Sequence, residues 1–164
     1  VAPRRLEHDR RWYDVSWKGL PDRSGGVAMN IGIHFFDLLM WLFGDLQETE
    51  VHLRDARRMA GRLELSGARV LWYLSVEEED LPESHLAEGK HAHRSIAMDG
   101  KELEFSGGFT DLHTRVYESA LRGQGYTITE ARPSIETVYR IRTDPLAKRP
   151  GDVHPLAERH LARV

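Results

Sequence analysis

Residues 25–37 read Gly-Gly-Val-Ala-Met-Asn-Ile-Gly-Ile-His-Phe-Phe-Asp, and the apolar run then continues to Gly44. The two glycines allow a tight turn of the backbone, and the residues after them predict one helix over about 27–43 that ends at Gly44, a favoured C-cap residue. Because this helix is apolar on nearly all sides, we expect it to be buried between a sheet and another surface.

Three polar side chains interrupt the apolar helix: Asn30, His34 and Asp37. Asn30 and His34 lie four residues apart and would share one face of an α-helix. A histidine on an apolar helix is most often a core residue with satisfied hydrogen bonds. An amide beside an imidazole also suits the binding and deprotonation of a hydroxyl. The spacing alone does not decide between these two interpretations.

The rest of the chain changes from strand-like to helix-like patterns. Strands are predicted over residues 4–9, 48–56, 62–65, 68–77, 94–98 and 101–105, with hairpin turns at Ser66-Gly67 and Asp99-Gly100. Helices are predicted over 111–121, with Thr110 as N-cap, and over 129–142, with loops at 20–26 and 77–90 and an extended tail after 142. This order predicts an α+β fold, an open-faced and mainly antiparallel sheet with helices on one face.

The strand around Trp72 is apolar on both of its alternations. Val70, Trp72 and Leu74 share one face, and Leu71 and Tyr73 share the other. One face can take the helices, and the other would need a further surface to cover it. The sequence therefore predicts self-association.

The amino-acid composition limits the classes of protein to which the chain can belong. The 164 residues are 40% hydrophobic and 30% charged, as in one ordinary globular domain with a real core. The net charge of −3 gives no general attraction to nucleic acid or to an anionic membrane, and residues 31–43 are too few to span a bilayer, so we expect neither partner. Without cysteine, disulfide and thiolate chemistry are excluded, which fits a cytoplasmic location.

The pattern Gly-Gly-x-x-x-Asn-x-Gly-x-His-x-x-Asp resembles the C-terminal domain of the glucose–fructose oxidoreductase / inositol dehydrogenase (Gfo/Idh/MocA) family. The resemblance covers residues 10–155. Residues 12–19, 109–113 and 131–136 resemble the branch that oxidises UDP-N-acetylglucosaminuronic acid (a UDP-N-acetyl-2-amino-2-deoxyglucuronate) at its 3-hydroxyl in bacterial surface-polysaccharide (lipopolysaccharide) synthesis. It implies a fold like the C-terminal domain of glyceraldehyde-3-phosphate dehydrogenase, a nucleotide-sugar substrate, NAD, and a homo-oligomer formed through the open sheet face.

Family members begin with an NAD(P)-binding Rossmann domain, which has a Gly-x-Gly-x-x-Gly turn and a Glu-Lys-Pro lysine that works beside the histidine. Neither sequence occurs in this chain. We therefore expect residues 1–164 to form a substrate-binding and oligomerisation domain that is incomplete at its N-terminus. NAD would be bound by the absent domain, no residue of this chain would bind the cofactor, and the chain alone would be inactive.

The resemblance also implies functional roles for polar residues of the helix over 27–43. His34 is the catalytic base by its motif position, and Asn30 orients the substrate at a position that is often aspartate in the wider family. Asp37 lies three residues after His34 and either orients the imidazole or bonds the backbone. Arg132 and His113 are ordinary surface or packing residues in most proteins.

The aromatic segment that precedes the glycines supplies the remaining candidates for substrate binding. Tyr13 and Trp17 offer flat faces for a sugar or uracil ring, and Lys18 and Arg11 can meet a carboxylate or diphosphate. The alternative is a strand edge with exposed aromatic rings and solvated charges. On a straight strand Trp17 and Lys18 point to opposite faces, so the segment must turn for both to reach one ligand.

A histidine-rich loop contains His85, His91 and His93. His-x-His on a strand would place two rings on one face, which suits a metal. No cysteine completes such a site and a mobile polar loop is the commoner explanation, so we predict no metal; a zinc hydrolase is the corresponding third hypothesis. The main alternative to a dehydrogenase domain is a catalytically silent oligomerisation or sugar-binding module that kept the fold.

Overall fold

The computed structural model describes residues 16–107, 111–148 and 150–161. The chain divides into two compact units. The first joins the residues up to Val76 with those from Ala131 onward, and the second is Glu77–Glu130. Each unit has its own antiparallel sheet, so the single sheet expected over residues 48–105 is wrong, although the α+β class is confirmed.

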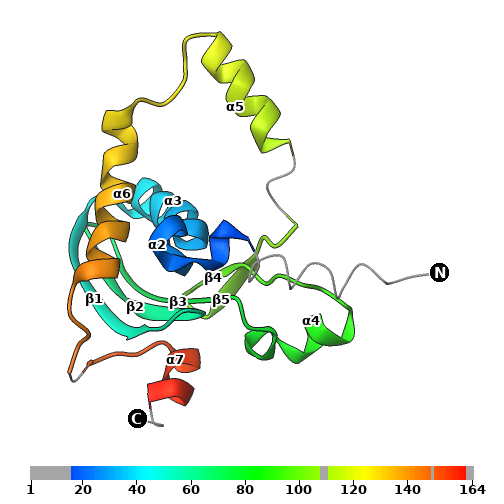
Figure 1. Cartoon of the computed structure of the whole chain (residues 1–164), viewed down its shortest axis with the longest axis vertical. Coiled ribbons are helices and arrows are strands. Elements are labelled where there is room, and N and C mark those ends of the chain that lie inside the picture. Colours follow the sequence, from blue (N-terminus) through cyan, green and yellow to red (C-terminus); the bar gives the residue numbers. More distant parts are fainter. Residues whose placement is uncertain (1–15, 108–110, 149, 162–164) are drawn as a thin grey trace. The chain divides into compact units, whose positions relative to one another are not determined.

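The first unit places helices and a three-stranded sheet together (Figure 1). Its strands are hydrogen-bonded in the order β1-β2-β3. The elements are η1 (Trp17–Gly19), α2 (Pro21–Ser24), the π-helical turn η2 (Ala28–Gly32), α3 (Ile33–Phe43), β1 (Leu46–Arg54), β2 (Arg58–Leu65), β3 (Arg69–Ser75), most of α6 (Ile128–Thr143) and α7 (Pro155–Leu161).

Helices α3 and α6 lie on one face of this sheet (Figure 1). The ring of Phe36 in α3 meets Trp72 in β3 edge-on, with centroids 5.2 Å apart. Arg54 in β1 donates hydrogen bonds of 2.9 Å to the backbone oxygens of Ile141 and Asp144, which fixes the end of α6. The largest fully buried side chains are Phe36, Leu63, Ile141, Val27, Val51, Val138 and Thr137.

The predicted long helix is present, and its end is confirmed. Gly44 takes a φ of 85° and its N–H donates to the Met40 oxygen at 2.9 Å, which closes the last turn. Its beginning differs from the prediction, because α2 forms where a loop was expected, with Pro21 at the first helical position. Gly25 and Gly26 follow with φ of 78° and 72°, a reversal that only glycine makes without strain.

Gly32 explains why the long helix lies so close to the sheet. A Cβ at this position would meet Leu74 Cδ1 and Phe36 Cε2 at 2.7 Å, closer than side chains approach. The residue itself is buried. The third glycine of the motif is therefore required for the close packing of η2 against β3.

The helical segment from α2 to α3 is also long and apolar enough to be considered as a membrane span. Pro21–Phe43 comprises 23 residues with a mean hydropathy of 1.5, so by length and composition alone it could cross a membrane. Residues 31–43 by themselves are too few. The core helix of a folded domain passes the same test. Here Phe36 and Leu39 of α3 are buried within the first unit, but only 28% of the segment is buried and Trp41 and Leu42 are 79% and 49% exposed. The expectation that the helix is buried on nearly all sides is therefore wrong for this face.

The opposite face of the sheet corrects one expectation. Trp72 and Leu74 are buried as predicted, but Leu71 and Tyr73 do not form an apolar face. Leu71 pairs with Arg62 of β2, so a charged residue stands next to it on the same face. The expectation considered β3 alone, whereas β2 alternates arginine and glutamate with its apolar residues.

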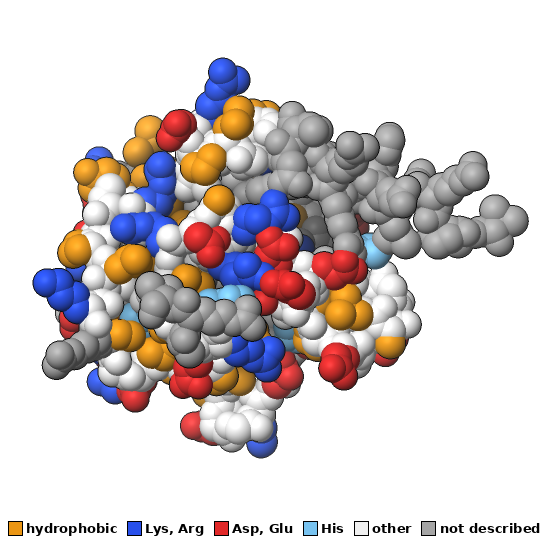
Figure 2. Space-filling model, turned by 60° about the horizontal axis from the view of Figure 1, so that its bottom comes forward, with side chains coloured by type: hydrophobic (Ala, Val, Ile, Leu, Met, Phe, Trp, Pro, Cys, Tyr) orange, Lys and Arg blue, Asp and Glu red, His pale blue; other side chains and the backbone are white. Residues whose placement is uncertain are grey.

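Ion pairs run across this opposite face. Arg62 contacts Glu64 and lies 3.4 Å from Glu50 of β1, and Arg69 of β3 lies 2.6 Å from Glu64 and 3.2 Å from Asp152. Figure 2 shows basic and acidic side chains lying together on the face it displays. A network of this kind contributes more than isolated surface pairs do, and it makes the face polar.

Strand β1 carries a bulge. Val51 pairs with Gly61 and Leu53 with Ala60, so His52 is an extra residue between them. A regular strand over 48–56 would place Val51 and Leu53 on one face, whereas here they pair with adjacent residues of β2 and lie on opposite faces. His52 is 2% exposed, and its Nε2 lies 2.8 Å from the Glu50 carboxylate.

The extended tail expected after residue 142 is wrong as well. The Ala147 N–H donates to the Val51 oxygen at 2.8 Å, which leads the chain along the edge of β1. Helix α7 then begins at Pro155 and buries Ala157. Tyr73 stacks on His154 and His160, with ring centroids 5.6 and 6.3 Å apart, so α7 covers part of the opposite face.

The attachment of α7 should depend on pH. Burial lowers the pKa of His154 below its ordinary value of about 6.5. The unfolded chain then binds the proton more readily, so the stability present above about pH 6.5 is lost as the pH falls. Protonation would also remove the Nδ1 acceptor of the Leu156 N–H, a bond of 3.2 Å.

Denaturant unfolding of the wild type and of His154→Asn at pH 7.5 and 5.5 measures this. The asparagine keeps an acceptor at the start of the helix and does not titrate, so its free energy of unfolding should change less between the two pH values. Equal changes in the two proteins would contradict the assignment.

The second unit contains short elements. They are η3 (Glu78–Asp80), α4 (Glu83–Ala87), β4 (Ser95–Met98), β5 (Lys101–Glu104) and α5 (Leu112–Leu121). The hairpin predicted at Asp99-Gly100 is confirmed, since both residues have positive φ, 52° and 74°. Residues 77–90 are partly helical and not a plain loop. Thr110, the expected N-cap of α5, lies outside the described residues.

Candidate functional site

The predicted site residues fall into two groups. Arg11 and Tyr13 lie outside the described residues, as does the strand expected over 4–9. Trp17 and Lys18 belong to η1, Asn30 belongs to η2, and His34 lies in the first turn of α3. All four belong to the first unit, and they are described in that order.

The segment of Trp17 and Lys18 turns, as the prediction required. Ser16 accepts a hydrogen bond of 3.2 Å from the Lys18 N–H through its hydroxyl, and the chain winds into the short helix η1. The Lys18 ammonium lies 5.9 Å from the centre of the Trp17 ring, so both side chains lie on the same side. Trp17 is 55% exposed, which leaves the indole accessible to a ligand.

Asn30 connects this segment to the long helix. Its Nδ2 donates a hydrogen bond of 3.2 Å to the backbone oxygen of Lys18. Asn30 lies in the π-helical turn, a local widening of the helix that is frequent at functional sites. The sequence did not indicate that turn. The amide therefore holds η1 against η2, close to where His34 follows on the same helix.

His34 is exposed on α3, although the helix is apolar. Phe36 and Leu39 are the residues of α3 that enter the core. Within the described residues, His34 forms no hydrogen bond or ion pair. The interpretation as a satisfied core histidine is therefore wrong, and the imidazole is available to a hydroxyl group of a ligand.

Asp37 has a structural partner instead of His34. Its Oδ1 accepts a hydrogen bond from the hydroxyl of Ser134, which is buried in α6. Thr137, one turn later, lies 3.6 Å from the Met40 sulfur and donates to the Pro133 oxygen at 2.8 Å. Ser134 and Pro133 belong to the segment 131–136 that carries the family resemblance, so that segment joins α6 to α3.

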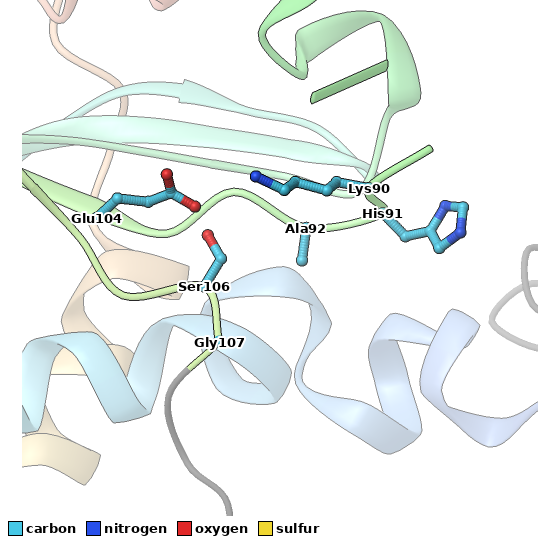
Figure 3. A pocket seen from close by; sticks show the side chains of 6 residues that line it. All are labelled: Lys90, His91, Ala92, Glu104, Ser106 and Gly107. Carbon is cyan, nitrogen blue, oxygen red and sulfur yellow. The ribbon is translucent and has the colours of Figure 1, made fainter. Parts of the chain in front are cut away.

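The histidine-rich loop lies in the second unit. His85 on α4 and His93 before β4 lie edge to face, with ring centroids 4.7 Å apart. His91 is exposed, and Figure 3 shows its ring directed away from Glu104. The alternative considered for His91 and His93, two rings on one face of a strand, does not occur, because residues 90–94 do not form a strand.

Residues 4–81 match the model of the oxidoreductase family, C-terminal alpha/beta domain. The helix with Asn30 and His34 and the sheet behind it lie within this match. The chain belongs to the Gfo/Idh/MocA family, of which it represents the C-terminal domain.

Two solved structures are similar to most of the chain. Both are of the WlbA (WbpB) dehydrogenase from Thermus thermophilus, one in complex with NAD and α-ketoglutarate and one in complex with NAD and UDP-GlcNAcA. Their identities to this chain are 51% and 49%, each with a TM-score of 0.82. Each match covers 88% of this chain and 47% of the other, so the chain spans about half the length of these relatives.

Proposed function

We propose that this chain is the substrate-binding part of an NAD-dependent dehydrogenase that oxidises the 3-hydroxyl of a UDP-N-acetylamino-sugar uronate in surface-polysaccharide synthesis. The observation that carries the proposal is the exposed His34 on the helix that Asn30 joins to the Trp17–Lys18 turn. The similarity to a dehydrogenase solved with UDP-GlcNAcA supports the substrate class.

Each residue has a role in this chemistry. Oxidation of a secondary alcohol removes a hydride from carbon and a proton from oxygen, and the neutral imidazole of His34 would take that proton. The hydride acceptor is NAD, which we propose is held by a separate dinucleotide-binding domain with the lysine that works beside His34. Lys18 would attract the carboxylate or diphosphate, and Trp17 would stack on a ring.

The alternative function is a sugar-binding or oligomerisation module without catalysis. The chain has no dinucleotide fingerprint, which is the observation that keeps this alternative open. The dehydrogenase and a silent sugar-binding module both predict that this chain binds the nucleotide sugar, whereas an oligomerisation module does not. Only the dehydrogenase predicts turnover once the dinucleotide-binding domain is joined to it.

Binding by the chain itself tests the substrate class. Calorimetry should detect UDP-GlcNAcA more strongly than UDP-GlcNAc, which lacks the carboxylate, and should detect no NADH. Lys18→Ala should weaken the uronate about tenfold, because a hydrogen bond to a charged group contributes about 1.5–3 kcal/mol. The neutral sugar should lose less.

Arg23→Ala is the matched control, since Arg23 is an exposed basic residue on the neighbouring helix α2. It should leave both affinities unchanged. Equal losses for the two sugars in Lys18→Ala would remove Lys18 from the site. Tight NADH binding would overturn the division of roles between this chain and a separate domain.

We further propose that the parent enzyme is a cytoplasmic homo-oligomer. The apolar sheet face that first suggested self-association is polar in the structure, so the proposal now depends on the family alone. Light scattering of the purified chain over a range of concentrations measures it, and a monomer throughout would contradict it.

A further inference from the structure

Three ligand-type side chains of the second unit converge on one point. His85 comes from α4 and is buried, His93 comes from the segment before β4, and Glu104 ends β5. The His85 Nε2 lies 3.1 Å from Glu104 Oε1 and 3.3 Å from His93 Nδ1. All three donor atoms lie within 4.8 Å of one another.

Hydrogen bonding alone satisfies this cluster poorly. The single proton that His85 Nε2 can carry faces both a carboxylate oxygen and a ring nitrogen. If it goes to Glu104, the lone pair of His93 Nδ1 has no proton of its own. If His93 donates to His85 instead, the lone pairs of His85 and Glu104 face each other. A cation between the three atoms would satisfy every lone pair at once.

The distances fit a metal ion. Ligand bonds of about 2.0–2.1 Å in a tetrahedral arrangement place neighbouring donor atoms roughly 3.3 Å apart. Two of the three separations between donor atoms, 3.1 and 3.3 Å, have this length, and the third, between His93 and Glu104, lies within 4.8 Å and would shorten to about the same length when an ion binds. Two imidazoles with one carboxylate form a common ligand set for late first-row divalent cations.

The outer partners are those that a metal ligand needs. His93 Nε2, the nitrogen turned away from the cluster, lies 3.2 Å from the Glu102 carboxylate and 3.0 Å from the Ser95 hydroxyl. A carboxylate on this nitrogen keeps the proton there, so Nδ1 is free to bind a cation. His85 Nδ1 lies 3.5 Å from the Ser84 hydroxyl.

A pocket borders the cluster at Glu104. Its volume is about 460 Å³, and Glu104 is the one proposed ligand among its lining residues, which are Lys90, His91, Ala92, Glu104, Ser106 and Gly107. Figure 3 shows the Lys90 side chain extending toward Glu104. The Lys90 ammonium pairs with Glu88 at 2.8 Å. It also lowers the pKa of Glu104, after the larger effects of the hydrogen bonds from His85 and Ser106. Lys90 would therefore compete with a cation for this carboxylate.

We propose that His85, His93 and Glu104 bind one late first-row divalent cation, for which Zn²⁺ is the probe. The ion would join α4 to the β4–β5 hairpin, and its open coordination position would face the pocket. This site is separate from the residues proposed for sugar oxidation, and it does not depend on that function.

Calorimetry of the 164-residue chain with Zn²⁺ should give one ion per chain, and Co²⁺ should give the intense visible absorption of a four-coordinate site. Loss of an outer partner of a metal ligand typically costs about 10–100-fold in affinity, so loss of a ligand should cost at least about 100-fold. We expect that loss for His93→Ala and for the isosteric Glu104→Gln, and about tenfold for Glu102→Gln. Lys90→Met should strengthen binding.

His113→Ala is the matched control, because it removes an exposed histidine of the second unit that is not among the residues lining the pocket. It should leave the affinity unchanged. If it weakens Zn²⁺ as much as His93→Ala does, the ion is held by surface histidines and the proposal fails. Failure of Glu104→Gln to weaken binding, with circular dichroism unchanged, would also overturn it.

Discussion

Replacing His34 with alanine should lower turnover about 10²- to 10⁴-fold in the proposed enzyme, in which a dinucleotide-binding domain is joined to this chain, because this is the usual effect of losing a general base. Substrate affinity should change little, because the imidazole acts mainly as the proton leaves the hydroxyl. Stability should change little as well, because His34 is exposed and is not part of the core around Phe36.

Steady-state kinetics, substrate calorimetry and thermal unfolding of the same variant separate these effects. His34→Gln should be equally slow, since an amide does not take up the proton. His91→Ala, which removes another exposed histidine, should retain normal turnover. Normal turnover in His34→Ala would mean that a different residue is the base. It would favour the interpretation that this helix belongs to a catalytically silent module.

Local signals in the sequence were sufficient for much of the fold. The helix end at Gly44 and the two hairpin turns were predicted correctly, because each depends on the backbone of a few adjacent residues. The turn at Trp17 and Lys18 followed from the requirement that both side chains reach one ligand. His34 was selected by motif; the structure shows that it is exposed on α3, and its catalytic role stays a prediction.

Contacts between distant residues account for what was missed. Asp37 bonds Ser134 across 97 positions of sequence, and no local pattern indicates that pairing. The bulge at His52 and the docking of α7 on Tyr73 depend on tertiary packing in the same way. The convergence of His85, His93 and Glu104 requires the β4–β5 hairpin to return the chain, so the spacing of the histidines alone did not indicate that Glu104 would lie beside two of them.

Replacing Phe36 with alanine should destabilise the first unit by about 3–5 kcal/mol, the range for truncating a buried aromatic side chain. Phe36 is 1% exposed, its ring packs edge-on against Trp72, and Gly32 leaves no side chain that could fill the cavity. Since whole domains are stable by only about 5–15 kcal/mol, this loss would be a large fraction of the total.

Denaturant unfolding followed by tryptophan fluorescence measures the change, with the slope of the transition checked against the wild type. Trp41→Ala is the matched control: it removes a larger aromatic ring from the same helix, but Trp41 is 79% exposed. Its stability should stay within about 0.5 kcal/mol of the wild type. If both variants lose the same stability, α3 does not pack on β3 through Phe36. If only Phe36→Ala loses stability, the face of α3 that carries Phe36 is the one that anchors the helix, and with it His34, to the sheet.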